Sequence, residues 1–394
     1  MRVVSQDLDD EVAGTSVADR LEVHAWRGGA LVAQGLAVTA WSLGWDASRA
    51  VQGQATVTVA DPDGDLAPWG MGDALAPGGS RLQITWVSGL SGIRVPLGWW
   101  RIRAADPAEQ WRVYRGGDGS HVARVPSGGH VSLAADEETA TIEMDRLDAQ
   151  VVTAPTSLGE VRRLLADLVP VVVHPSVVDG PVPAGLVYGD SRLSAVIGHL
   201  TDRGAVYRMG PAGELEVLPA GGVGPVWTLA GGDDGVLVGV ARSLSDDGVY
   251  NAAVSTSTAP DGAPLVGRAQ LTSGPLAWGV GTAFGRVPIF HQAIATTQSG
   301  VDADARTVLA SRVAAGEVDL AVTCLTHPGL QLHDRVVVLA PTRAGDAAIE
   351  GRVVAMTMRS ATSEAGTTPA KAMALTVRVS VEALEAIAAR VRRG

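Results

Sequence analysis

Apolar and polar residues alternate through most of the first 152 positions. Leu21, Val23 and Ala25 alternate with polar neighbours, and Gly28-Gly29 then provides a two-residue hairpin turn. Similar short patterns follow at 36–45, 54–60, 81–87, 94–102, 131–134 and 140–144. Regularly spaced strands without intervening helices are typical of a sandwich or barrel. The pattern therefore predicts a first tube-like β domain over residues 1–152.

The periodicity changes to that of helices after Pro155. Ser157 and Glu160 form a capping box, which is followed by an apolar stripe at positions 158, 161, 164, 165 and 168. A second helix begins after Asp190-Ser191 and stops at Gly204. Two short strands, 205–209 and 214–218, then form a hairpin. These elements predict a small α+β domain over residues 153–224.

Strand patterns return at Trp227 and continue to Val379, so that 225–379 is expected to be a second β domain. It contains a helical block at about 302–315, and 362–369 is small and polar enough for a mobile loop. Residues 380–394 form a capped C-terminal helix, which places Leu384, Ile387 and Val391 on one side. The fold class is therefore mainly β with α+β insertions.

Composition narrows the possible functions. The 394 residues carry a net charge of −11, which argues against a protein that grips nucleic acid or an anionic membrane, since counterion release needs clustered cations. The single cysteine, Cys324, excludes an intrachain disulfide and a CxxC metal site. No signal peptide and no apolar run of membrane-spanning length is present. We expect a chain made in a cytoplasm, without stable membrane binding.

One motif resembles a nucleophile. Gly189-Asp190-Ser191 lies between a predicted strand and a helix, where a GDS-type esterase places its serine. That chemistry needs a base as well, and the Asp118-x-x-His121 pair precedes the serine instead of following it near the C-terminus. We therefore interpret Ser191 as a helix cap, and no catalytic residue is predicted.

Two groups of residues could hold a metal ion. Asp61, Asp63 and Asp65 have the alternate spacing of a calcium loop, but the glycine and the bidentate glutamate of an EF-hand are missing, so a solvated turn is favoured. His327 and His333 lack further ligands at zinc spacing and are interpreted as turn and edge residues. Neither a metal site nor a cofactor is predicted.

Tryptophan is concentrated in the first β region. Eight of the ten tryptophans lie before residue 152, at positions 26, 41, 45, 69, 86, 99, 100 and 111. Trp41 and Trp45 share one strand parity and are expected in the core, whereas adjacent Trp99 and Trp100 must point to opposite faces. One of this pair is a candidate for an assembly interface; two buried layers and carbohydrate stacking are the alternatives.

Four segments, in this order, resemble the hub or tail-tip proteins of long-tailed bacteriophages, often called minor tail or baseplate-hub proteins. They are residues 57–68 with 75–79, the helix and hairpin at 193–218, Gly248-Val249-Tyr250-Asn251, and the passage from Phe284-Gly285 to His327-Pro328-Gly329-Leu330 and His333-Asp334-Arg335-Val336. Together they span most of the chain. One position departs from the pattern, since family members often have Gly-Asp where this chain has His333-Asp334, which puts the turn type in question.

The resemblance implies a structural virion protein without enzymatic activity, located at the tail tip and assembled in the host cytoplasm. Such hubs form a trimeric ring of two tube-like β domains per subunit. They join the tail-tube or distal tail protein to tip or fibre components, and they leave a channel for the tape-measure protein and for DNA in transit. An acidic lumen would not trap passing DNA.

Under this resemblance we expect subunit or partner contacts at Trp99 or Trp100 and along the C-terminal helix at Leu384, Ile387 and Val391. The alternative function is a carbohydrate-binding tail-tip module that recognises a cell-surface receptor through its tryptophans. A cell-wall hydrolase is the third possibility, but no segment of the sequence is left over to encode a lytic domain.

Overall fold

The structure is a computed structural model. It describes residues 1–2, 4–13, 19–115, 122–148, 150–182, 188–232, 235–242, 249–274, 276–293, 295, 297–314, 317–342, 345–360, 372–381, 383–384, 387–388 and 391. The predicted mobile loop at 362–369 and the pair Asp118 and His121 lie outside these residues, as does Gly248 of the third family-like segment.

The chain divides into two compact units. The first comprises Met1–Ala241, Ala321–Pro341 and Asp346–Val377, and the second comprises Arg242–Leu320, Thr342–Gly345 and Arg378–Gly394. The two units do not coincide with the four segments expected from the sequence. The segment boundaries at 152, 224 and 379 remain a prediction.

Strands are the predominant regular structure of the chain, as the sequence predicts. The helices are α1 (Gln6–Ala13), α2 (Thr139–Met144), α3 (Ser157–Leu165), α4 (Arg192–Asp202) and α5 (Gln298–Ala314). The strands of the first 220 residues are β1 (Asp19–Arg27), β2 (Ala30–Ala33), β3 (Val38–Asp46), β4 (Gly53–Ala60), β5 (Ser80–Ser88), β6 (Arg94–Arg115), β7 (Val122–Glu137), β8 (Val171–Val173), β9 (Ala205–Met209) and β10 (Leu215–Pro219). The later strands are β11 (Pro225–Leu229), β12 (Leu237–Arg242), β13 (Ala252–Thr258), β14 (Pro264–Gln270), β15 (Pro288–Gln292), β16 (Glu317–Leu325), β17 (Arg335–Ala340), β18 (Ala347–Arg359) and β19 (Ala372–Ser380).

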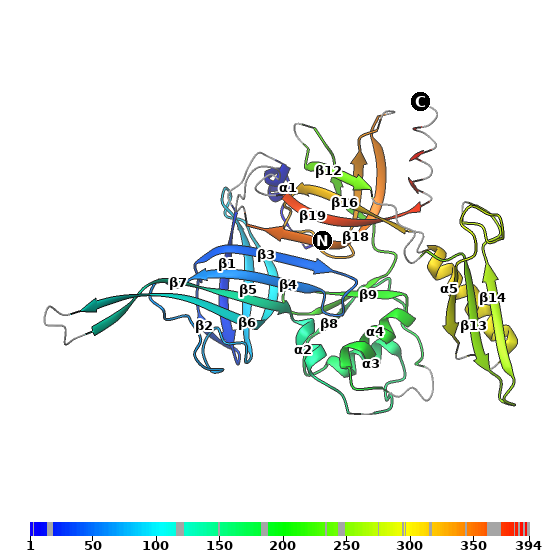
Figure 1. The fold of residues 1–394 in the computed structure, drawn as a ribbon, viewed down its shortest axis with the longest axis horizontal. Coiled ribbons are helices and arrows are strands. Elements are labelled where there is room, and N and C mark those ends of the chain that lie inside the picture. The colour runs from blue at the N-terminus through cyan, green and yellow to red at the C-terminus, as the bar shows by residue number, and fades with distance from the viewer. Residues whose placement is uncertain are drawn as a thin grey trace. The chain divides into compact units, whose positions relative to one another are not determined.

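One sheet joins strands from both ends of the sequence. Its strands follow the order β12-β16-β19-β18-β3-β4-β7-β6-β5-β1-β2, with β17 pairing β18 and β11 pairing β17. The junction is the antiparallel pairing of β18 with β3, in which Met356 lies opposite Trp45. Strands β11, β12 and β16–β19 of the predicted second β domain therefore share one hydrogen-bonded sheet with the strands of the first (Figure 1).

The strand register follows the alternation in the sequence. In β1, Leu21, Val23 and Ala25 are buried while their neighbours are less so, because successive side chains point to opposite faces. Gly28 and Gly29 connect β1 to β2 with φ of 56° and 80°, the left-handed values that a two-residue hairpin turn requires. The predicted hairpin is confirmed.

The segment 140–144 is helical, and its prediction as a strand was wrong. Residues Thr139–Met144 form α2, in which Ile142 is fully buried and Met144 is exposed. Apolar residues at alternate positions over five residues fit a strand, but so short a run also fits one and a half helical turns. Packing of Ile142 into the apolar cluster beside α3 and α4 stabilises the helix.

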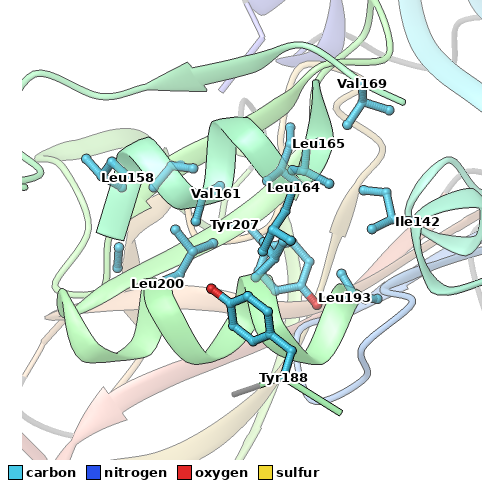
Figure 2. Close-up of a cluster of buried hydrophobic side chains, with 14 of the residues drawn as sticks. Ile142, Leu158, Val161, Leu164, Leu165, Val169, Tyr188, Leu193, Leu200 and Tyr207 are labelled. Carbon is cyan, nitrogen blue, oxygen red and sulfur yellow. The ribbon is translucent and has the colours of Figure 1, made fainter. Parts of the chain in front are cut away.

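The small α+β region has its own apolar core (Figure 2). Helices α3 and α4 place their apolar stripes against each other and against the sheet β8-β10-β9. The two helices and the β9–β10 hairpin were predicted from the sequence, whereas β8 was not. Thr156, not Ser157, caps α3, since its side chain accepts from Gly159 N; Ser191 caps α4 by accepting from Ser194 N. The first cap was thus placed one residue late, whereas the second is confirmed.

Strands β6 and β7 lie within the main sheet and extend beyond their neighbours as a long two-stranded arm (Figure 1). The pairing of β5 with β6 ends at Arg101, and the pairing of β4 with β7 ends at His130. Beyond these points β6 and β7 pair only with each other, up to Arg115 opposite Val122. We name the segments 103–115 and 122–129 the β6–β7 arm.

The second unit holds a three-stranded sheet, β14-β13-β15, covered by α5. Helix α5 buries Val301, Ala305 and Leu309, so the predicted helix is confirmed with an earlier start. A Cβ added to Gly267 of β14 would lie 2.3 Å from the carbonyl oxygen of Val301. The helix therefore approaches β14 as closely as only a glycine allows.

Candidate functional site

Trp99 and Trp100 of β6 point to opposite faces of the sheet, as their adjacency requires. Trp100 is 1% exposed and packs edge-on against Trp45, with ring centroids 5.3 Å apart. Trp99 is half-buried on the other face and packs edge-on against Trp26 at 5.7 Å. Trp100 is therefore a core residue, and Trp99 is the member of the pair that remains available to a partner or ligand.

Trp99 lines a pocket of about 460 Å³. One wall is formed by the β sheet, with Trp26, Arg81, Gln83 and Trp99, and the other by the segment after α3 and the β9–β10 turn; the lining residues are Trp26, Gly29, Arg81, Gln83, Trp99, Glu138, Leu168, Val169, Pro170, Ala212 and Gly213. This volume is in the range of small-molecule sites. The Trp26–Trp99 pocket combines an aromatic surface with a few polar groups.

Polar atoms at the Trp26–Trp99 pocket are incompletely used within the described residues. Arg81 Nη1 donates to Glu138 Oε1 at 2.9 Å, while Glu138 Oε2 is buried and has no hydrogen-bond partner there. The indole nitrogen of Trp26 is also buried without an acceptor. Buried polar groups are usually paired, so Trp26 and Glu138 each keep one unpaired polar atom beneath this wall of the pocket.

The C-terminal helix is only partly described. Residues 381, 383, 384, 387, 388 and 391 are helical, and Ala383 N donates to Ser380 Oγ at 3.2 Å, which is the predicted cap. Ile387 is 9% exposed, whereas Leu384 and Val391 are half-buried. The contact role expected for these three residues and for Trp99 or Trp100 remains a prediction.

The turn at 327–335 is built on Asp334. Its Oδ2 accepts from Gln331 N at 2.9 Å, and its Oδ1 accepts from Arg208 Nη1 at 2.8 Å. Arg208 also donates to Glu216 Oε2 at 2.6 Å. The Met1 ammonium group forms an ion pair with the same Asp334 oxygen. Asp334 therefore fixes the turn to β9, an ion-pair partnership that sequence patterns did not indicate.

His333 keeps the backbone conformation of a glycine. Its φ is 66°, and it is the one non-glycine residue with positive φ among those the structure describes. The ring is buried and its Nδ1 lies 3.1 Å from Arg352 Nη1. Burial, together with the charges of Arg352 and Arg208, lowers the pKa of His333 to about 3, so the ring is neutral. His333 thus adopts a left-handed backbone conformation that glycine reaches more easily than other residues.

His327 lies in the core, so its prediction as an edge residue was wrong, whereas His333 lies in a turn, as predicted, although its ring is buried. The His327 ring is fully buried against Trp227, with centroids 4.7 Å apart. Its Nε2 lies 2.8 Å from Asp9 Oδ1 of α1, and its Nδ1 accepts from Gly329 N at 3.0 Å. Both ring nitrogens are therefore occupied by structural hydrogen bonds, with Nε2 as the donor to Asp9.

The other chemical candidates serve local structure. Ser191 Oγ donates to Glu143 Oε2 at 3.0 Å while it caps α4. Asp61 is buried, and its Oδ2 accepts from Leu66 N and Ala67 N, which closes the turn after β4. Within the ranges that the structure describes, no three His, Cys, Asp or Glu side chains are grouped to hold a metal ion. None of the helices described there is long and apolar enough to span a membrane.

The fold is shared with two tail proteins of known structure. A tail protein from Neisseria meningitidis MC58 matches 91% of this chain and 96% of its own, with a TM-score of 0.58 and 14% identity. The 43 kDa tail protein of prophage MuSo2 from Shewanella oneidensis matches 92% of this chain and 99% of its own, with a TM-score of 0.53 and 13% identity. The resemblance predicted from the sequence is confirmed at the level of the fold.

Comparisons by sequence give no match. No protein-family model and no curated protein matches the chain. At 13–14% identity the structural likeness shows the fold alone, so that the role of individual residues has to be inferred from the geometry of this chain.

Proposed function

We propose that the chain is a structural component of a phage tail, a hub that forms a ring at the tail tip. The observation that carries this proposal is the match of the whole fold, over more than 90% of both chains, to two tail proteins. The Trp26–Trp99 pocket and the β6–β7 arm both lie in the unit that holds the main sheet, where contacts with neighbours are expected.

In the proposed assembly three copies form a closed ring on the tail axis. The ring joins the tail-tube or distal tail protein to tip or fibre proteins, and its channel passes the tape-measure protein and DNA. The protein is then a virion component that is assembled in the host cytoplasm and has no enzymatic activity. The net charge of −11 supports a channel that does not retain DNA.

Sedimentation velocity and electron microscopy test the ring. The purified chain is examined over a wide concentration range, alone and with the tail-tube or distal tail protein encoded beside it. We expect ring particles with threefold symmetry, at least when the tail protein is present. A chain that stays monomeric at every concentration, and forms no ring with either partner, contradicts the proposed function.

A second candidate is a carbohydrate-binding module, and the Trp26–Trp99 pocket favours it. Tryptophan rings stack on sugar rings, and Gln83, Arg81 and Glu138 provide donors and acceptors for hydroxyl groups. A glycan array should then give binding that Trp99→Ala abolishes. Trp69→Ala is the matched control, because Trp69 is exposed and lies outside the pocket lining. An array without signal removes this candidate.

A further inference from the structure

The β6–β7 arm exposes apolar side chains on both of its faces. Trp111, Val113, Tyr114, Val122 and Val125 are each 44–56% exposed. The register pairs Val113 with Arg124 and Tyr114 with Ala123, so one face carries Trp111, Val113 and Val122 and the other carries Tyr114 and Val125. An isolated two-stranded ribbon is marginally stable in water. An arm with two apolar faces therefore lacks the cover that such side chains normally receive.

The charge of the β6–β7 arm is opposite to that of the chain. The arm contains four arginines, Arg103, Arg112, Arg115 and Arg124, against two acidic residues, Asp106 and Glu109. Its outer part, 111–115 with 122–125, contains three of these arginines and no acidic residue. The chain as a whole carries a net charge of −11. A cationic apolar ribbon and an acidic chain are complementary, and complementary charge brings protein surfaces together and sets their register.

From these observations we propose that the β6–β7 arm docks on a second copy of this chain. Its tryptophan, tyrosine and valines pack on an apolar strip of the neighbouring copy, and its arginines meet acidic side chains beside that strip. Aromatic residues and arginine are the residue types that dominate such contacts. Valines on both faces favour a protein surface over a nucleic acid, because aliphatic side chains find no partner along a phosphate backbone.

This inference rests on one part of the proposed function, namely that copies of the chain associate. It adds the segment that makes the contact. A ring that forms equally well without an intact arm would leave the proposed function standing and overturn this inference. A chain that self-associates through the arm but forms no ring with a tail partner would support this inference and overturn the proposed function.

The first experiment measures self-association of full-length variants by sedimentation velocity. Arg124→Glu is compared with Arg20→Glu, an exposed arginine of β1, and Trp111→Ser is compared with Trp69→Ser. We expect each arm variant to raise the dissociation constant at least about tenfold, with an unchanged urea midpoint, and each control to match the parent chain. Equal dissociation constants for arm variants and controls overturn the proposal.

The second experiment locates the partner surface directly. Val113→Cys is labelled with a benzophenone maleimide; native Cys324 is fully buried, and burial raises the pKa of its thiol, so it does not compete. Illumination of a mixture of ¹⁴N and ¹⁵N protein should give crosslinked peptides that contain both isotopes. Crosslinks confined to one chain, or none at the highest concentration reached, overturn the proposal.

A nucleic acid is the competing occupant, and it has its own test. Fluorescence anisotropy with a labelled 12-nucleotide single strand and with a duplex of the same length measures binding to the parent chain and to Arg124→Glu. We expect the parent chain to show no binding at concentrations below about 100 µM at physiological salt. Proteins that bind DNA without sequence specificity already bind in that concentration range. Tighter binding that Arg124→Glu removes would assign the arm to nucleic acid instead of to a second copy.

Discussion

The α3–α4 core and the β6–β7 arm use apolar side chains in opposite ways. In the core, Leu164, Leu193 and Val196 are buried within the chain, and the polar groups between the helices are closed into one hydrogen-bonded network. In the arm, residues of similar apolarity such as Val113 stay exposed although their strands are fully paired. Regular pairing alone therefore does not create a core; a strand needs a second layer against its face.

The network in the α3–α4 core has three buried partners. Tyr188 Oη donates to Glu160 Oε1 at 3.0 Å, and His199 Nε2 lies 2.6 Å from the same hydroxyl. Burial alone would raise the pKa of Glu160, but hydrogen bonds from Arg163, Ala154 N and Tyr188 outweigh it and lower the pKa to about 2. Burial lowers the pKa of His199, so the neutral ring donates its Nε2 hydrogen to the tyrosine oxygen.

The largest expected effect is the loss of a core side chain. Leu164→Ala removes a side chain that is 1% exposed between α3 and α4. The lost burial and the cavity should lower the free energy of unfolding by about 2–5 kcal/mol. Urea unfolding measures it, with Val113→Ala in the arm as the control, expected within about 0.5 kcal/mol of the parent chain. Equal losses at both positions would show that the arm is packed in the isolated chain.

The next largest effect on stability is expected at Glu137. This residue is the buried last residue of β7, and the first residues of β7 lie in the arm. Burial raises the pKa of Glu137 to about 7, against hydrogen bonds from Thr139 and the amides of Gly53 and Gln52. A raised pKa means that its contribution to stability is complete below its ordinary value near 4.5 and is lost as the pH rises through about 7.

Glu137→Gln should therefore flatten the dependence of stability on pH. Between pH 5 and pH 8 the parent chain should lose about 1–3 kcal/mol more than the variant, at about 1.4 kcal/mol for each unit of pKa. Urea unfolding at the two pH values measures the difference. Glu160 acts with the opposite sign, because its lowered pKa makes its contribution present above about 4.5 and lost as the pH falls toward 2. Identical slopes for the two chains would contradict the assignment to Glu137.

An effect of similar size is expected from opening the polar network. Tyr188→Phe leaves Glu160 and His199 without their shared hydroxyl partner, at a cost of about 1–3 kcal/mol. Tyr114→Phe removes the same atom from an exposed residue of the arm and should leave the free energy of unfolding within about 0.5 kcal/mol. A Tyr188→Phe variant as stable as the parent chain would mean that water replaces the hydroxyl.

The smallest effect is that of a helix cap. Thr156→Ala removes the acceptor of Gly159 N at the start of α3 and should cost about 1 kcal/mol in thermal or urea unfolding. Ser157→Ala is the matched control, since the capping box was placed at Ser157 from the sequence. A larger loss at Ser157 than at Thr156 would restore that first interpretation.

The spacing of apolar residues over short stretches of sequence was sufficient to predict most helices and strands. Alternation located β1, and the period of Leu193, Val196 and Leu200 located α4, because one buried face constrains every second residue or every third and fourth one. The same patterns could not show that Trp111 and Val113 lack a covering layer, since an exposed strand and a covered strand alternate alike. Five residues at 140–144 were also too few to separate a strand from a helix.

Short sequence patterns could not predict contacts between residues that are far apart in the chain. One of Trp99 and Trp100 was predicted at an interface because adjacent strand residues point to opposite faces, but the pocket beside Trp99 needs the segment after α3 and the β9–β10 turn. Arg208 and Asp334 are far apart in sequence, and nothing in either segment names the other as its ion-pair partner. His333 is an intermediate case, because the resemblance marked the position and only the backbone angle of 66° explained it.

The pairing of β18 with β3 has a consequence for synthesis. Asp46 of β3 lies opposite Ala355 of β18, so this edge of β3 cannot be paired until almost the whole chain has left the ribosome. At ~5–20 residues per second the wait is on the order of fifteen seconds to a minute. During that time an unpaired, partly apolar strand edge is open to other chains. The main sheet is therefore completed on this side of β3 only after β18 has been made, however early β3 itself is synthesised.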